Sequence, residues 1–184
     1  MKNLIILCTV AWVALITISM ANVQSDEVKM KLYSNSFKDN GKIPLKYVMP
    51  AAGGENVSPE LHWENPPKDT KSFALLMEDP HPVANHWIHW AVVNIPPTCN
   101  SLPEGASLHN MPEGAVELIN SFGFKGYGGP QPPPGTGDHP YVFTLYALDT
   151  PQITISGKVT LDSFEKALEG HIIAKATLTG YFGR

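Results

Sequence analysis

Proline- and glycine-rich connections divide this chain into short strand-like runs, and this division constrains the fold more than any other feature. Five runs alternate apolar with polar residues or are largely apolar: 28–34, 43–48, 72–79, 86–95 and 141–149. The run "SFALLMED" at 72–79 is apolar up to its acidic end, which predicts a strand buried on both faces. Prolines at 80, 96, 97 and 151 follow three of these runs and stop them.

One segment has helical spacing. In "TLDSFEKALEG" at 160–170, Thr160 is a suitable N-cap, Phe164 and Leu168 fall on one face, and Gly170 suits a helix end. The run 174–182 then alternates as a last strand. Because helices do not alternate with strands along the chain, a parallel βαβ sheet is disfavoured. The sequence therefore predicts a mainly β fold, a mostly antiparallel sandwich or barrel with one or two attached helices.

The first 21 residues have the layout of a secretory signal peptide. Lys2 precedes an apolar run at 4–18, and Ser19 and Ala21 form a small-x-small cleavage site. Cleavage there leaves residues 22–184 as one domain, secreted or delivered to a periplasm. A retained anchor is the alternative, although the apolar run is short for a membrane span of about 20 residues.

Composition excludes several classes of function. The formal net charge is −4 and no basic run exists, so nucleic acid is a poor partner. After the signal, no apolar stretch is long enough to span a membrane. Cys8 lies within the signal, which leaves Cys99 with no partner for an internal disulfide. No cofactor-binding motif is present.

The stretch "MEDPHPVANHWIHW" at 77–90 carries candidate site residues. Asp79 ends a buried strand before Pro80 and is expected at a sheet end, facing a loop. Strict strand alternation would place His89 on one face with Trp87, Ala91 and Val93, and Ile88, Trp90 and Val92 on the other. Both faces are apolar, so His89 is expected to be buried. A core histidine with satisfied nitrogens is the competing interpretation.

Metal binding is disfavoured. His86 and His89 have a spacing found in metal sites, but residues three apart in a strand point to opposite faces. His81 and His86 are expected to be exposed loop residues.

The stretch "YGGPQPPPGTGDHPY" at 127–141 predicts a rigid loop that ends at His139. Proline fixes φ and glycine permits positive φ, so the loop can hold one conformation at low entropic cost. Gly126, Gly128 and Gly129 would let backbone N–H groups approach an anion. Tyr141 should point to the same side as His139. Alternatively, residues 126–138 simply cross the end of the sandwich.

Several of these motifs together resemble the phosphatidylethanolamine-binding protein family, in its bacterial and archaeal Raf-kinase-inhibitor-like branch. They are "NVSPELHWENPP", "MEDP…HWIHWAVVNIP", "SFGFKGYGGPQPPPGTGDHPYVFTLYALD" and "LDSFEKALEGHIIAKATLTGYFGR", in that order. The resemblance runs from about residue 28 to the C-terminus. It implies a β-sandwich with a large central antiparallel sheet and a small pocket for phosphate or phospholipid head groups.

The resemblance also implies which residues form the pocket. The matching positions are Asp79, His89, His139 and Tyr141, with Gly129, Pro130 and Pro132 at the rim. Two positions depart from the family pattern. His81 stands where a second aspartate is frequent, and Pro140 stands where arginine is usual, which removes a positive charge and a backbone N–H.

Two classes of function fit these residues. The favoured one is an exported binding protein for a phosphate-like anion, a lipid head group or a protein partner. For a protein partner, the resemblance implies inhibition of a kinase or protease. The alternative is a hydrolase of phospho- or acyl esters that uses Asp79 with the two histidines. The sequence supplies no nucleophile elbow, and Ser121 and Cys99 are unsupported as nucleophiles.

Overall fold

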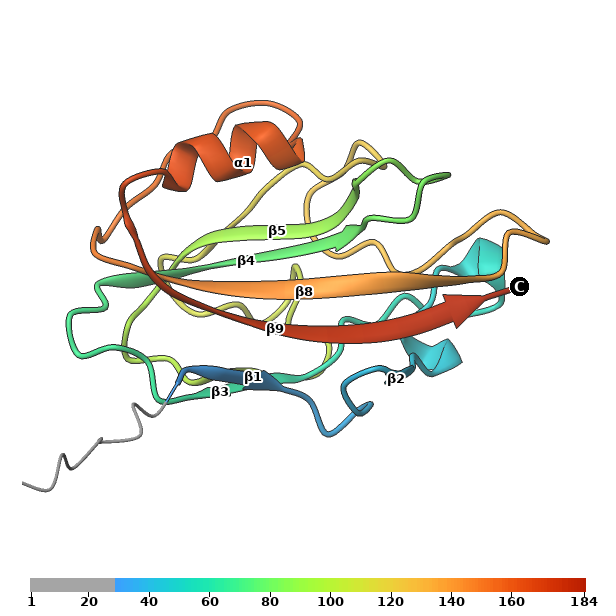
Figure 1. Ribbon diagram of the computed structural model, residues 1–184, viewed down its shortest axis with the longest axis horizontal. Helices are drawn as coiled ribbons and strands as arrows, with labels where there is room; N and C mark the ends of the chain where they lie inside the picture. The colour runs from blue at the N-terminus through green and yellow to red at the C-terminus, as the bar shows by residue number, and fades with distance from the viewer. Residues whose placement is uncertain (1–28) are drawn as a thin grey trace, which may run out of the picture.

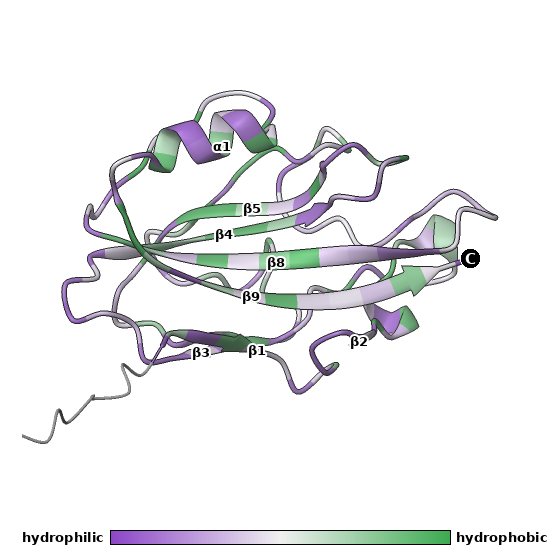
Figure 2. Cartoon of the chain, in the orientation of Figure 1, coloured by the Kyte–Doolittle hydropathy of each residue, from purple (hydrophilic) through white to green (hydrophobic). Residues whose placement is uncertain are grey.

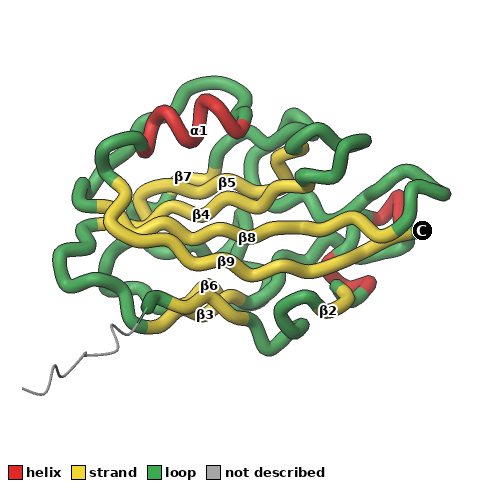
Figure 3. Tube along the Cα trace, in the orientation of Figure 1, coloured by secondary structure: helices red, strands yellow, loops and turns green. Residues whose placement is uncertain are grey.

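The computed structural model describes residues 29–184, so the predicted signal peptide lies outside the described residues. Two β-sheets stack on one another, and a helix covers the outer face of the larger sheet (Figure 1). Strands account for most of the regular structure, as the tube in Figure 3 shows. The predicted mainly β sandwich with an attached helix is confirmed.

The larger sheet has six strands in the order β2-β9-β8-β4-β5-β7. Their bounds are β2 Gly41–Lys42, β9 Ile172–Gly183, β8 Asp138–Leu148, β4 Ser72–Asp79, β5 Trp87–Ile95 and β7 Val116–Glu117. All neighbouring pairs are antiparallel except β2 with β9. Strand β4 lies between β5 and β8 and is buried along nearly its whole length, as its apolar run predicts.

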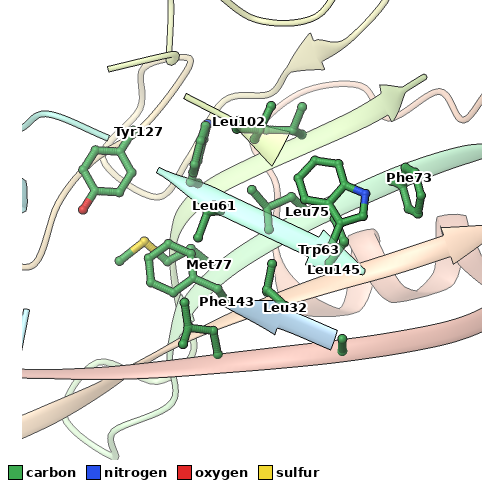
Figure 4. Close-up of a cluster of buried hydrophobic side chains, with 14 of the residues drawn as sticks. Leu32, Leu61, Trp63, Phe73, Leu75, Met77, Leu102, Tyr127, Phe143 and Leu145 are labelled. Carbon is green, nitrogen blue, oxygen red and sulfur yellow. The ribbon is translucent and has the colours of Figure 1, made fainter. Parts of the chain in front are cut away.

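The smaller sheet has three strands in the order β1-β3-β6. Their bounds are β1 Lys31–Tyr33, β3 Leu61–Glu64 and β6 Ser101–Leu102. Its apolar side chains meet those of the larger sheet in one core, shown in Figure 4, to which Leu32, Trp63, Phe73, Phe143 and Leu145 belong. Burial of such side chains contributes about 1.5–3 kcal/mol each, so this inter-sheet core holds the sandwich together.

Helix α1 (Leu161–Leu168) packs on the opposite face of the larger sheet. Thr160 caps it, since its side chain accepts from the Ser163 N–H while Ser163 accepts from the Thr160 N–H. Apolar and polar residues alternate along the helix in Figure 2. Phe164 and Leu168 are fully buried in a second core with Leu76 and Tyr146.

Two predicted elements differ from the structure. Residues 43–48 were expected to be a strand, but Leu45–Tyr47 form a 3-10 helix, which starts after Pro44 and buries Tyr47. The strand expected at 141–149 begins earlier, so His139 and Pro140 are part of β8 and lie opposite Phe182 and Tyr181. Strand β4 pairs with β8 only as far as Val142. Beyond that point β8 is locally an edge, where proline is tolerated.

A bulge at His89 breaks the expected alternation of β5. Met77 pairs with Trp90 and Glu78 pairs with Ile88, so His89 has no partner on β4. As a result Ile88 packs with Ala91 and Val93 on the helix side, whereas Trp90 and Val92 belong to the inter-sheet core. The prediction that Ile88, Trp90 and Val92 share one face was therefore wrong. The bulged residue, His89, packs edge-on against Tyr141, which belongs to the inter-sheet core.

Candidate functional site

Four predicted site residues line one cavity of about 460 Å³. Asp79 comes from the end of β4, His89 from β5, and His139 and Tyr141 from the start of β8. They meet because β4 lies between β5 and β8. The start of β8 and the end of β9 lie at the right of Figure 3, beside the C-terminus. A larger hollow of about 640 Å³ lies between β1 and β9, but it is more open and has none of these residues.

Asp79 and His139 form a buried pair whose polar atoms are all engaged within the protein. Nδ1 of His139 donates to Oδ2 of Asp79 at 2.6 Å, and Oδ1 of Asp79 accepts from the His81 N–H at 2.9 Å. Nε2 of His139 lies 2.9 Å from Oγ1 of Thr136, which donates to the Pro133 carbonyl at 2.7 Å. The pair thus ties the end of β4 to the loop before β8 and acts as a scaffold of the cavity.

His89 presents one nitrogen to the backbone and leaves the other free. Its Nδ1 is 2.7 Å from the Gly128 carbonyl and 3.1 Å from the Gly129 carbonyl. Because carbonyl oxygens only accept, Nδ1 carries the proton. Burial lowers the pKa of His89 to about 4, although those carbonyls and the Asp79 charge favour protonation. At neutral pH the ring is therefore neutral, and Nε2 is an acceptor.

Tyr141 contributes a free donor beside this acceptor. Its side chain is fully buried, and its hydroxyl has no hydrogen-bonding partner in the described part of the chain. Burial and the Asp79 charge raise the pKa of Tyr141 well above its usual value, although the Gln131 N–H beside its oxygen and the Arg184 charge act in the opposite direction, so it remains a phenol whose own proton is free to be donated. The His89 ring meets the Tyr141 ring edge-on at 5.0 Å. A buried hydroxyl without a partner is costly, and such groups are common where a ligand binds.

A family model described as phosphatidylethanolamine-binding protein matches residues 33–183. The chain belongs to the phosphatidylethanolamine-binding protein family. This confirms the resemblance inferred from the motifs.

Relatives of this family member occur in archaea and bacteria. A protein of Methanothermobacter thermautotrophicus named UPF0098 is 40% identical over 156 residues, which cover 84% of this chain and 99% of the relative. The UPF0098 protein YbcL of Escherichia coli is 34% identical, with 97% of each chain covered. The crystal structure of YbcL superposes with a TM-score of 0.79, at 35% identity and covering 85% of this chain and 99% of that one. The homologue CT736 of Chlamydia trachomatis gives a TM-score of 0.72 at 36% identity, with 85% and 98% covered.

The two positions at which this family member departs from the usual pattern differ in how they are placed relative to the cavity. His81 was expected to be exposed, but it is half-buried and stacks on His139, with ring centroids 3.8 Å apart and planes at 17°. The turn after Asp79 brings it back, because the carboxylate accepts the His81 N–H. His86 is exposed as expected and faces Glu78 at 2.7 Å. Pro140 does not line the cavity.

Gly129 and Pro130 support the cavity from behind and do not line it. The Gly128 N–H donates to the His89 carbonyl at 2.9 Å, and the Gly129 N–H donates to Oδ1 of Asn56 at 2.7 Å. These amides are therefore not available to an anion, contrary to the expected glycine-rich concavity. A Cβ on Gly129 would collide with the Tyr47 carbonyl oxygen, so only glycine fits there. The loop lines the cavity instead through Gln131, Pro132 and Pro133.

The sequence motifs did not indicate the apolar wall of the cavity. Val83, Ala84, Trp87 and Phe122 line it. Phe122 packs edge-on against both Trp87 and His89, each at 5.4 Å. Phe122 lies within the "SFGF" stretch quoted for the family resemblance, which was the available signal.

Arg184 is a second residue that the sequence did not single out. Its Nε donates to the Pro132 carbonyl at 2.7 Å, and its Nη1 donates to the Ala51 carbonyl at 2.8 Å. Its own carbonyl accepts from the Gly135 N–H at 2.8 Å. These bonds fasten the loop that carries the cavity rim to the end of β9.

Arg184→Ala is expected to lower the free energy of unfolding by about 1 kcal/mol, because it removes two side-chain hydrogen bonds from a charged donor at a partly exposed site. Urea denaturation measures the change. Arg184→Lys is the matched control, since it keeps the charge but cannot reproduce the two-pronged donation. If lysine restored full stability, the charge and not the geometry would hold the rim.

Within residues 29–184, no group of three or more histidine, cysteine, aspartate or glutamate side chains is arranged to hold a metal ion. The same part of the chain contains no helix with the length and apolar character needed to cross a membrane.

Proposed function

We propose that this family member is an exported binding protein whose cavity takes a phosphate-like anion or a phospholipid head group. One observation carries the proposal: the buried Tyr141 hydroxyl has no partner in the described chain and lies beside His89, whose Nε2 makes none of the described hydrogen bonds. Free polar atoms in a closed-in site indicate a polar ligand.

The hydrogen bonds within the cavity separate residues that position the site from residues that can bind a ligand, and this supports the proposal. Asp79 and His139 use their polar atoms on each other and on the loop, and so they position the site. Tyr141 and His89 keep one polar atom each for a ligand. The apolar wall formed by Trp87 and Phe122 suits the organic part of a head group. A protein partner that presents such a group would be recognised by the same atoms, and its identity stays a prediction.

No observation favours the hydrolase. The described residues that line the cavity include no serine, threonine or cysteine. Ser121 accepts from the Ile88 N–H through its hydroxyl oxygen and donates its own N–H to the Ile88 carbonyl, so it is tied to β5. Cys99 packs against the inter-sheet core, and burial raises the pKa of its thiol, which disfavours the reactive thiolate. Binding is therefore the function that the geometry supports best.

Tyr141→Phe tests the proposal with opposite effects on stability and binding. The variant removes a buried hydroxyl without a partner, so the free energy of unfolding of the ligand-free protein is expected to rise by about 1 kcal/mol. Stabilisation by phosphate should fall strongly in the same variant. Thermal unfolding of residues 22–184 measures both, in phosphate, phosphoethanolamine, acetate and chloride at matched ionic strength.

Tyr146→Phe is the control, because its ring packs against α1 on the other face of the sheet. It should leave the response to phosphate unchanged. The absence of any ligand-specific stabilisation of the unaltered protein would contradict the proposed function.

A further inference from the structure

The cavity contains an acceptor whose role is fixed by the backbone. Nδ1 of His89 lies within hydrogen-bonding distance of two carbonyl oxygens, at 2.7 and 3.1 Å. Neither carbonyl can donate, so the proton of a neutral ring is held on Nδ1. Nε2 then carries a lone pair and no proton. A ligand oxygen without hydrogen that approached Nε2 would meet this lone pair.

The groups around His89 do not change the state of Nε2, which keeps its lone pair and carries no proton. Asp79 faces it from β4, His139 and Tyr141 face it from β8, His81 lies in the turn after β4, and Arg184 lies behind the rim. Burial lowers the pKa of His89 and the His139 ring acts in the same direction, and together they outweigh the two glycine carbonyls and the Asp79 carboxylate, so the neutral form prevails near neutral pH. Opposite the acceptor lies the Tyr141 hydroxyl, a buried donor without a partner in the described chain, and Gln131 also lines the cavity. The site therefore offers a donor and an acceptor side by side.

We infer that the cavity selects phosphate-class anions that carry their own proton, with the ligand O–H donating to Nε2 of His89 and a ligand oxygen accepting from Tyr141, and that it rejects anions without a proton. This inference rests on the proposed function and states which protonation state of the ligand the site takes. Sulfate has nearly the shape of phosphate but no hydrogen to donate. Its oxygen would leave the acceptor unsatisfied or require the buried ring to take up a proton, and sites of this kind discriminate strongly.

Titration calorimetry at about pH 7.5 tests the inference, because this pH is above the second pKa of about 6 of a phosphate monoester. Inorganic phosphate still carries an O–H there, methyl phosphate is mostly without one, and sulfate has none. We expect phosphate to bind about tenfold or more tightly than sulfate. Measurements in two buffers of different ionisation enthalpy should show almost no net proton uptake with phosphate. With methyl phosphate they should show uptake of about one proton.

Two further arms separate the sources of the ligand and the contribution of neighbouring groups. Glycerophosphoethanolamine represents a lipid head group whose phosphodiester has no O–H, so it should bind more weakly than phosphate, and binding as tight as that of phosphate would overturn the inference. His81→Gln removes the neighbouring imidazole that could also take up a proton, and the uptake with methyl phosphate should persist in it.

His89→Asn keeps an amide N–H close to the position of Nδ1 but removes Nε2. The ratio of phosphate to sulfate affinity should fall below about threefold in this variant. If the variant does not fold, the ligand series on the unaltered protein decides the matter. Sulfate binding as tight as phosphate binding would overturn the inference while leaving the proposed anion site intact. If neither anion bound, the proposed function itself would fail.

Discussion

His139→Ala is expected to lower the free energy of unfolding by about 3–5 kcal/mol, the range observed when one partner of a buried charged pair is removed. The reason is the Asp79 carboxylate, which is nearly inaccessible and 2.6 Å from Nδ1 of His139. Without the imidazole, Oδ2 of Asp79 loses its donor while the carboxylate stays largely buried. Urea denaturation at neutral pH measures the effect.

His86→Ala is the matched control. It also breaks a histidine–carboxylate contact, at 2.7 Å to Glu78, but the His86 side chain is 48% exposed. A contact of this kind contributes less than about 1 kcal/mol. Adding Asp79→Asn to His139→Ala should recover part of the lost stability, since the uncompensated charge is then gone. Equal costs for His139→Ala and His86→Ala would contradict the scaffold role of the buried pair.

Lowering the pH from 6.5 to about 4 is expected to reduce the free energy of unfolding by about 3 kcal/mol through the titration of His89 alone. The pKa of His89 is about 4 in the folded protein, against an ordinary value of 6.5, and each unit corresponds to about 1.4 kcal/mol. Below pH 6.5 the unfolded chain takes up the proton while the folded ring stays neutral, so protons favour unfolding. The contribution of the neutral His89 ring to the free energy of unfolding is complete above pH 6.5. It declines between pH 6.5 and about 4 and declines no further below that.

Other carboxylates and histidines also titrate in this range, so the comparison is made with His89→Asn. Stability curves against pH for the two proteins should converge as the pH falls from 6.5 to 4, because only the unaltered protein loses the His89 contribution. Curves that run parallel over this range would mean that the buried ring does not have a lowered pKa in the folded state.

Local sequence patterns predicted most of the larger sheet but not its irregularities. The apolar run 72–79 corresponds to β4, because a strand buried on both faces needs apolar residues throughout. The alternation at 43–48 misled, since Ile43, Tyr47 and Val48 are buried as it indicates, but Leu45–Tyr47 form a 3-10 helix and not a strand. The bulge at His89 depends on pairing with β4, which no local pattern records.

The composition of the site was easier to predict than the role of each residue. The motifs singled out Asp79, His89, His139 and Tyr141, and the fold brings them to one cavity. Which nitrogen or oxygen remains free depends on contacts that are distant in sequence. Thr136 occupies Nε2 of His139, and the Gly128 carbonyl occupies Nδ1 of His89. His81 folds back onto His139 only because the Asp79 carboxylate holds its N–H.

In the proposed site His89 and Tyr141, and not the Asp79–His139 pair, bind the anion. Nitrogen NMR of the histidine rings during a phosphate titration tests it most directly, with the chain labelled in the imidazole nitrogens. We expect a large change in the Nε2 signal of His89, while the two nitrogens of His139 keep their shifts because their hydrogen bonds to Asp79 and Thr136 persist. A titration that moves the His139 signals and leaves Nε2 of His89 unchanged would contradict the account.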